Sequence, residues 1–300
     1  MTSVDPQTLN DAIHRSLDDL LIAFELEPAG ADRYRVAGER ERFDRVFGGQ
    51  TVAQALLAAH ASLGDAGERA VHSLHAYFVE AGVPGEAVDL AVERVRDGRS
   101  MSARHVTVTQ GSRTLLSALV SFHANPPEPA FSATPPPVPP PQQMPLLQDW
   151  ASAADEYLRP HAATWIEQPP PLELRLPEPP YFLGGDTAEG DRSHWMRLPR
   201  SVGDDPVLHA AMLAYASDYL LLDMAFRSHP ERPGLGDVSG FSLDHALWFH
   251  RPTRLDRWHL HTQHTRAISG HRGLVEGQIH DADGALVATA MQEVLVRPRR

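Results

Sequence analysis

The stretch from Gly48 to Ala61 reads Gly-Gly-Gln-Thr-Val-Ala-Gln-Ala-Leu-Leu-Ala-Ala-His-Ala, and it decides which fold we expect. Gly48-Gly49-Gln50 opens the stretch, and an apolar helix is predicted from Thr51 to Ala61. A helix that is apolar nearly all round has to be enclosed by other elements. Alternating segments that could form an enclosing antiparallel sheet follow at 73–78, 88–95, 102–110 and 114–123.

The same order of elements returns in the second half of the chain. Ala216-Ser217-Asp218 opens an apolar segment at 219–226, which we interpret as a second central helix. Further strands are predicted at 242–249, 259–266, 273–280 and 286–296. Short strands precede each helix, at 24–27, 34–36, 172–176 and 194–198. We therefore expect an α+β fold of two repeats, each a curved sheet around one helix, joined edge to edge so that strand edges are covered.

A proline-rich segment separates the two repeats. The stretch 125–143 contains nine prolines and cannot continue a sheet or helix, because proline lacks a donor N–H and has a fixed φ. A helix is predicted within 146–164, and a second proline cluster follows at 169–171. The predicted division is an N-terminal module at 1–125, a connector at 126–170 and a C-terminal module at 171–300.

Composition and charge exclude several classes of protein. The 300 residues carry a net charge of -12, which argues against a general nucleic-acid-binding protein. The chain lacks cysteine, which excludes disulfides and Cys-based metal sites. It has neither an apolar run long enough for a membrane span nor the N-terminal pattern of a signal peptide, so we expect a cytoplasmic protein. An anionic ligand would need a local basic patch, for which the candidates are Arg94, Arg96, Arg99 and Arg104. The alternative for these four is an ordinary solvated surface.

Five ordered blocks of sequence resemble one known family. They are Arg45-Val46-Phe47-Gly48-Gly49-Gln50, His72-Ser73-Leu74-His75-Ala76-Tyr77-Phe78, Arg96-Asp97-Gly98-Arg99-Ser100, Tyr215-Ala216-Ser217-Asp218, and Asp244-His245-Ala246-Leu247-Trp248-Phe249-His250-Arg251-Pro252. In this order and spacing they resemble the acyl-CoA thioesterase II family, which has a double-hotdog fold. The resemblance extends from about Leu20 nearly to the C-terminus and is weakest in the connector.

The resemblance implies a function and a set of catalytic residues. The family uses an Asp, a Thr or Ser, and a Gln, which match Asp218, Ser242 and Gln292. It implies hydrolysis of medium- to long-chain acyl-CoA to free fatty acid and CoA by an activated water, without a metal or other cofactor. It also implies a homo-oligomer, a dimer or tetramer, with acyl-CoA as its substrate. From charge and composition we expect no nucleic-acid partner and no membrane span.

The residue types suit this chemistry. If Asp218 lies at a helix start, the helix N-terminus would favour its ionised form, which can act as general base. Ser242 and Gln292 can hold a water, and the Gly48-Gly49 turn is a candidate for holding the oxyanion. In the repeat alignment Gln50 takes the place of Asp218 and Ser121 that of Gln292, so one active site, in the second module, is predicted.

Other interpretations of these residues stay open. Asp218 could cap a helix, Ser242 could be an ordinary strand residue, and Gln292 could lie on the surface. His245, which aligns with His75, is interpreted as a packed structural residue.

The alternative functions are a hotdog-type acyl-CoA hydratase, which would need a His beside its carboxylate, and a non-catalytic acyl-CoA-binding protein. A Ser-His-Asp hydrolase lacks its Gly-x-Ser-x-Gly motif here. A metal site at His259, His261 and His264 is disfavoured, because strand alternation puts His264 on the other face.

Overall fold

The computed structural model describes residues 5–38, 44–64, 69–124, 131–231, 234 and 238–298. Its helices are α1 Pro6–Ala23, α2 Gly48–Ala61, α3 Leu147–Ala153, α4 Arg159–Glu167, α5 Pro206–Ser217 and α6 Leu221–Arg227, with 3-10 turns η1 Pro141–Gln143 and η2 Tyr181–Leu183. The first-half strands are β1 Glu27–Gly30, β2 Arg33–Val36, β3 Ala70–Phe78, β4 Val88–Asp97, β5 Met101–Gln110 and β6 Arg113–His123. The second-half strands are β7 Glu173–Arg175, β8 Arg192–Arg197, β9 Val238–Ser242, β10 Asp244–Phe249, β11 His259–Ser269, β12 Arg272–Asp281 and β13 Leu286–Pro298.

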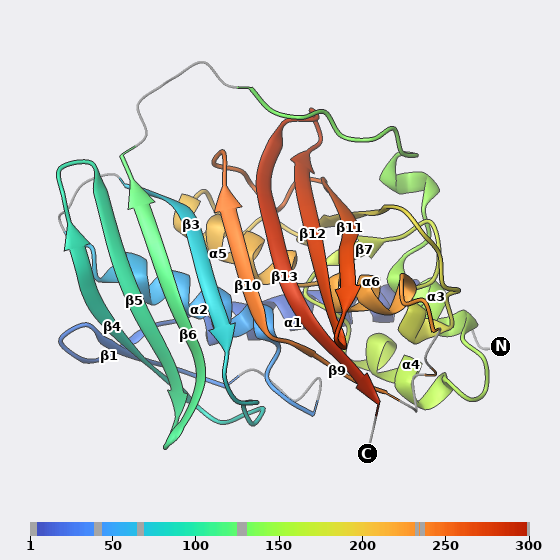
Figure 1. Cartoon of the computed structure of the whole chain (residues 1–300), viewed down its shortest axis with the longest axis horizontal. Coiled ribbons are helices and arrows are strands. Elements are labelled where there is room, and N and C mark those ends of the chain that lie inside the picture. The colour runs from blue at the N-terminus through green and yellow to red at the C-terminus, as the bar shows by residue number, and fades with distance from the viewer. Residues whose placement is uncertain are drawn as a thin grey trace.

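The strands of both halves form one continuous sheet. Its order is β1-β2-β4-β5-β6-β3-β10-β13-β12-β11-β8-β7, with β9 paired to β13 (Figure 1). The halves meet where β3 pairs antiparallel with β10. This confirms the expected α+β architecture and the joining of two halves edge to edge, which pairs two strands that would otherwise be open edges.

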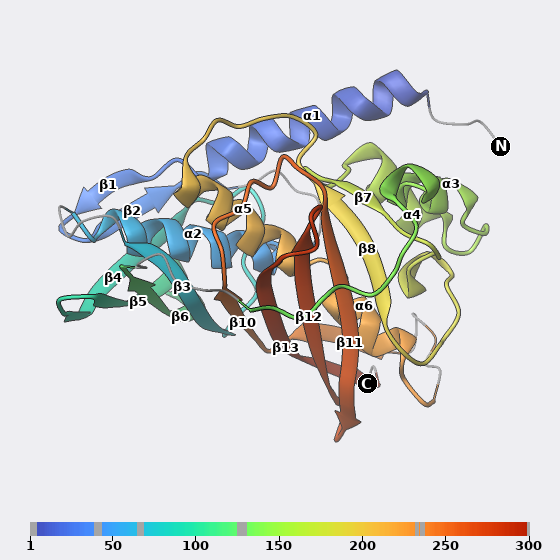
Figure 2. The ribbon, with the colours of Figure 1, turned by 90° about the horizontal axis from the view of Figure 1, so that it is seen from above.

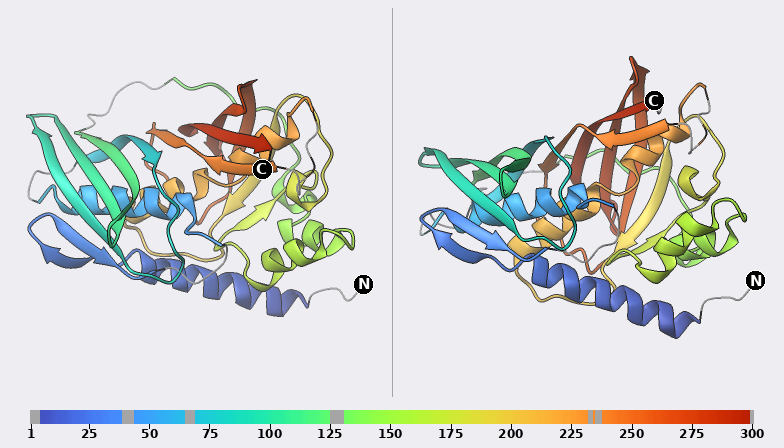
Figure 3. Two further views of the ribbon diagram at one scale, coloured as in Figure 1. Left: turned by 60° about the horizontal axis from the view of Figure 1, so that its bottom comes forward. Right: turned by 90° about the horizontal axis from the view of Figure 1, so that it is seen from below.

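The central helices lie side by side against this sheet. Helices α2 and α5 lie between the sheet and α1, which crosses their outer side (Figures 2 and 3). Most of α2 is buried, as its composition predicts, and Val52, Ala55 and Leu56 are fully enclosed. On the side of α2 that faces α1, the Gln54 amide donates to the carbonyl oxygen of Ala23, the last residue of α1, at 2.8 Å.

The helix predicted at 219–226 is present as α6, but Asp218 does not open it. The helix that packs beside α2 is α5, which ends at Ser217 and is absent from the sequence prediction. Asp205 caps α5 by accepting from the Val207 N–H, and Pro206 supplies the preset φ of a first helical residue.

The predicted 146–164 helix is two helices, α3 and α4, because Pro160 is favourable only in the first turn of a helix. The first-half strand predicted at 24–27 is also displaced, since Phe24 caps α1 and β1 begins at Glu27.

The connector crosses the outside of the second half. Its described part, residues 131–140, contains no helix or strand, and the Pro139 carbonyl accepts from the Trp195 indole at 2.9 Å. Pro126, Pro127 and Pro129 lie outside the described residues. The division at 125/126 and 170/171 stays a proposal. Within the described residues, no helix is long and apolar enough to cross a membrane.

Candidate active site

The structure places Asp218 at the junction of the two central helices. It caps the C-terminus of α5, and its side chain is buried against the N-terminus of α2. The Gly49 N–H donates to Asp218 Oδ2 at 2.8 Å. The expectation that Asp218 opens its own helix is therefore wrong, but a helix start does hold the carboxylate: the N-terminus of α2 in the other half.

Gly48 and Gly49 allow this close approach. A Cβ added at Gly48 would lie 2.8 Å from Asp218 Oδ2 and 2.9 Å from the Phe78 ring. Both glycines lie in the first turn of α2. The Gly49 N–H is committed to the carboxylate. That the Gly48-Gly49 turn holds an oxyanion stays a prediction.

Ser242 and Gln292 come together from two different strands. Ser242 ends β9, where it pairs with Val294 of β13, and the Gln292 Nε2 amide donates to Ser242 Oγ at 2.6 Å. Gln292 is fully buried, so the alternative that it is a surface residue is wrong. The amide of Gln292 also bonds to the Asp218 carboxylate and helps to keep it ionised. The three predicted residues therefore form one connected group.

The pKa of Asp218 reflects opposing influences. Burial raises the pKa of its carboxyl above the ordinary value of 3.8. The nearby His245, the Gly49 N–H and Gln292 act in the opposite direction, although burial has the largest effect. A carboxylate with a raised pKa accepts a proton more readily than an ordinary one at neutral pH.

His245 holds the amide of Gln292 in one orientation. It is fully buried, as expected for a packed residue, and its Nδ1 lies 2.6 Å from Gln292 Oε1. An ionised carboxylate only accepts hydrogen bonds, so the Gln292 nitrogen must face Asp218 and its oxygen must face His245. It follows that His245 Nδ1 carries a proton, while Nε2 lies 2.9 Å from Ser217 Oγ.

The repeat alignment needs correction by one residue. His75 is exposed and His245 is buried, so the two lie on opposite faces of their strands. In the first half, Leu74 of β3 and Val120 of β6 pair and face inward. They are the counterparts of His245 and Gln292 in the second half.

Ser121, which was aligned with Gln292, lies on the outward face of β6 and bonds to His72 at 2.8 Å. The first half thus carries an apolar pair where the second carries a polar one.

The other candidate residues lie apart from this group. Arg104 is buried and paired with Asp97, and Arg94 is paired with Asp32, so these two are not a free phosphate-binding patch. His259 and His261 are fully buried, and His264 lies on the other face. Over the described ranges, no group of three potential metal ligands occurs.

Solved structures with the same architecture define the fold class. A hot dog fold protein of unknown function from Alicyclobacillus acidocaldarius aligns over 94% of this chain and 98% of its own, with TM-score 0.73 and 20% identity. An acyl-CoA thioesterase II, TesB2, from Mycobacterium marinum aligns over 94% and 98%, with TM-score 0.74 and 30% identity. The chain is a double-hotdog protein, as predicted.

Sequence relatives identify the family. Residues 37–123 match the acyl-CoA thioesterase N-terminal domain and residues 133–296 match the acyl-CoA thioesterase C-terminal domain. Human acyl-coenzyme A thioesterase 8 is 36% identical over 91% of this chain and 86% of its own. Acyl-CoA thioesterase 2 of Haemophilus influenzae is 32% identical over 96% and 98%. The chain belongs to the acyl-CoA thioesterase family.

Proposed function

We propose that this protein is an enzyme that hydrolyses medium- to long-chain acyl-CoA to a fatty acid and CoA. The observation that carries the proposal is the buried Asp218 carboxylate on the first turn of α2, in contact with the Gln292–Ser242 pair. Relatives across nearly the whole chain are named acyl-CoA thioesterases, which supports this choice of reaction.

In the proposed mechanism, Asp218 takes a proton from a water that attacks the thioester carbonyl carbon. The C–S bond then breaks, and the departing thiolate of CoA takes up the proton that Asp218 accepted, which regenerates the base. The raised pKa of Asp218 suits a general base, and its fixed position lowers the entropy cost of aligning the water.

Ser242 and Gln292 are proposed to orient the attacking water. Ser242 Oγ accepts from the Gln292 amide, so its own proton is available for the water or the substrate carbonyl. Since the Gln292 nitrogen also contacts Asp218, one side chain connects the base to the hydroxyl. Loss of either should therefore lower kcat more than it raises KM.

The geometry disfavours a hydratase. A hydratase would need a His that reaches a carbon of the substrate, and the histidine next to Asp218 is His245. Both of its ring nitrogens have protein partners, and none of its surface is exposed.

The test of this proposal measures two reactions on purified protein. Release of free CoA from a panel of saturated acyl-CoAs, detected with a thiol reagent, should be rapid and greatest for medium or long chains. Hydration of crotonyl-CoA, detected by loss of enoyl absorbance, should be negligible. Fast hydration without CoA release would overturn the proposal.

We also propose that the protein is a cytoplasmic homo-oligomer, a dimer or tetramer. At one end of the sheet, the terminal strand β1 is exposed along its whole length, and a partner could cover such an edge. Light scattering on the purified protein should give a mass of two or four chains, and a monomer at micromolar concentration would contradict it.

A further inference from the structure

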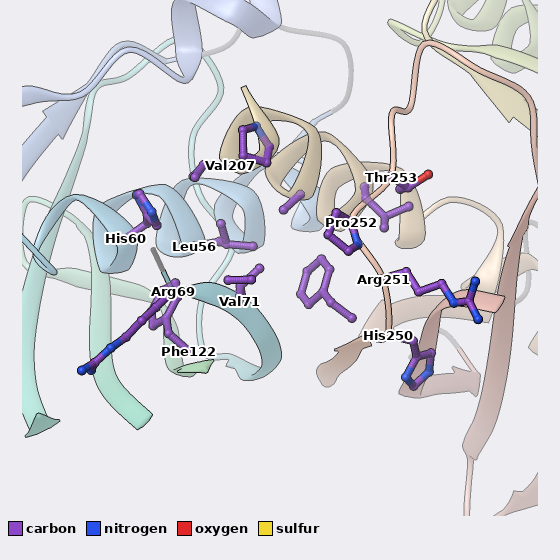
Figure 4. A pocket seen from close by; sticks show the side chains of 15 residues that line it. Leu56, His60, Arg69, Val71, Phe122, Val207, His250, Arg251, Pro252 and Thr253 are labelled. Carbon is purple, nitrogen blue, oxygen red and sulfur yellow. The ribbon is translucent and has the colours of Figure 1, made fainter. Parts of the chain in front are cut away.

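A cavity lies at the far end of the central helices from Asp218. It opens between the C-terminal end of α2 and the N-terminal start of α5 and has a volume of about 470 Å³ (Figure 4). Leu56, Phe122 and Leu213 form its buried wall, with Val71 and Val207 nearer the opening. This volume is within the range of roughly 300–1,000 Å³ typical of small-molecule sites.

This cavity occupies the place in the first half that the candidate active site occupies in the second. In β3, Val71 pairs with Phe122 just before an irregularity in the strand. In the second half, Ser242 pairs with Val294 just before the chain leaves β9 at Leu243. Val71 is therefore the counterpart of Ser242, and it lines the cavity.

The helix ends show the same relation. Asp218 caps α5 beside the start of α2, and at the other end of the pair Ser62 caps α2 beside the start of α5. The cavity thus lies where the first half would have its active site. Among the described residues that line it there is no Asp or Glu that could act as a base.

Two arginines stand at the opening of this apolar cavity. Figure 4 shows Arg69 on one side of the cavity and Arg251 on the other, with the two guanidinium groups pointing away from each other. Arg69 donates to the Ser102 hydroxyl and the Gly98 carbonyl, and Arg251 is exposed. Within the described ranges neither is paired with a carboxylate, although the chain carries a net charge of -12.

The other polar groups at the cavity contribute little charge. Burial lowers the pKa of His60 and of His250, so both rings are neutral at neutral pH. Asp205 lies close enough to influence His60, but its carboxylate accepts from the Val207 N–H at the start of α5. The N-terminus of α5 is therefore already capped, and Arg69 is held by the turn at Gly98, so Arg251 is the described group at the opening that could attract an anion.

We propose that this cavity binds a long-chain fatty acid without transforming it, with the alkyl chain between the helices and the carboxylate near the exposed Arg251. An apolar cavity with an exposed cation at its opening matches a ligand with one anionic end and an alkyl tail. The proposal goes beyond hydrolysis at Asp218 and does not depend on it, because the two sites lie at opposite ends of the helix pair.

The test uses a naturally fluorescent long-chain fatty acid, cis-parinaric acid, titrated into the full-length protein. Ala210→Trp fills the cavity from α5, and Ala61→Trp adds the same side chain at an exposed position of α2 outside it. We expect Ala210→Trp to weaken binding by about tenfold or more, and Ala61→Trp to leave it unchanged. Arg251→Glu, which alters only an exposed side chain, should weaken binding about two- to fivefold.

Two control measurements check the role of the carboxylate and the separation of the two sites. The methyl ester of the same fatty acid should bind more weakly, and Arg251→Glu should not alter its affinity. The CoA-release assay on Ala210→Trp should give unchanged kcat and KM with long-chain acyl-CoA.

Binding that is insensitive to both Ala210→Trp and Arg251→Glu would overturn the proposal. A rise in KM in Ala210→Trp would also overturn it, since the cavity would then belong to the catalytic acyl site. A protein that binds the fatty acid but releases no CoA would refute the proposed hydrolysis alone.

Discussion

Replacing His245 by two amides of different length isolates its contact with Gln292. Asparagine places its amide nitrogen close to the position of His Nδ1, so His245→Asn can still donate to Gln292 Oε1. Glutamine reaches the position of Nε2, so His245→Gln keeps the contact with Ser217 and loses the one with Gln292. Both variants remove the same ring, which makes each a control for the other.

The size of the effect follows from the buried bond that is lost. The Nδ1 to Oε1 distance is 2.6 Å, and both residues are fully buried. Leaving a buried acceptor without a donor costs about 1–3 kcal/mol. If that cost falls on the orientation of Gln292 in the transition state, His245→Gln should lower kcat roughly 5- to 150-fold. His245→Asn should retain most of the activity.

The assay is CoA release under saturating substrate, repeated in a Gln292→Ala background. If His245 acts only by orienting Gln292, the effect of His245→Gln should nearly vanish there. Equal losses in His245→Asn and His245→Gln would refute this reasoning. So would an unchanged effect of His245→Gln in the Gln292→Ala background.

Three further predictions concern the surroundings of the carboxylate and the stability of the second half. Gly48→Ala should lower kcat on the order of 100-fold by displacing the Asp218 carboxylate, which would lie 2.8 Å from the new Cβ, whereas Gly98→Ala in a distant turn should leave kcat unchanged. Asp218→Asn should be more stable than the wild type at neutral pH in urea unfolding. The raised pKa of Asp218 means that its ionisation destabilises the fold as pH rises from 3.8 through that pKa, so the advantage of the variant should grow over this window. Asp223→Ala should lower the free energy of unfolding by about 3–5 kcal/mol, because it leaves the buried Arg192 without its 2.7 Å ion pair.

Much of the fold could be predicted from hydrophobic pattern alone. The strands of both modules could be predicted because apolar and polar residues alternate along them. Helix α2 could be predicted because its residues are apolar on all sides over a longer run. The pattern of the first half predicts α6 but not α5, the second central helix. The start of α5 does carry a sequence signal, the capping Asp205 followed by Pro206.

The candidate site was less accessible to sequence reasoning. Asp218, Ser242 and Gln292 were selected by resemblance, and their contacts depend on how two helices and two strands meet. The role of Gly49 could not be predicted, because it lies 169 positions from Asp218 and contacts it only after the halves pack. The one-residue error that aligned His75 with His245 reversed the face of the strand, which only the observed register reveals.

The most direct test of the central claim compares two carboxylates of the second half. Asp218 is the proposed base, and Asp244 is a half-buried aspartate of β10 whose pKa is also raised by burial. Asp244 accepts from the Glu293 N–H at 2.7 Å, a bond that an asparagine can keep. We predict that Asp218→Asn lowers kcat for CoA release by at least about 100-fold while Asp244→Asn changes it less than about threefold. Near wild-type turnover by Asp218→Asn would contradict the account.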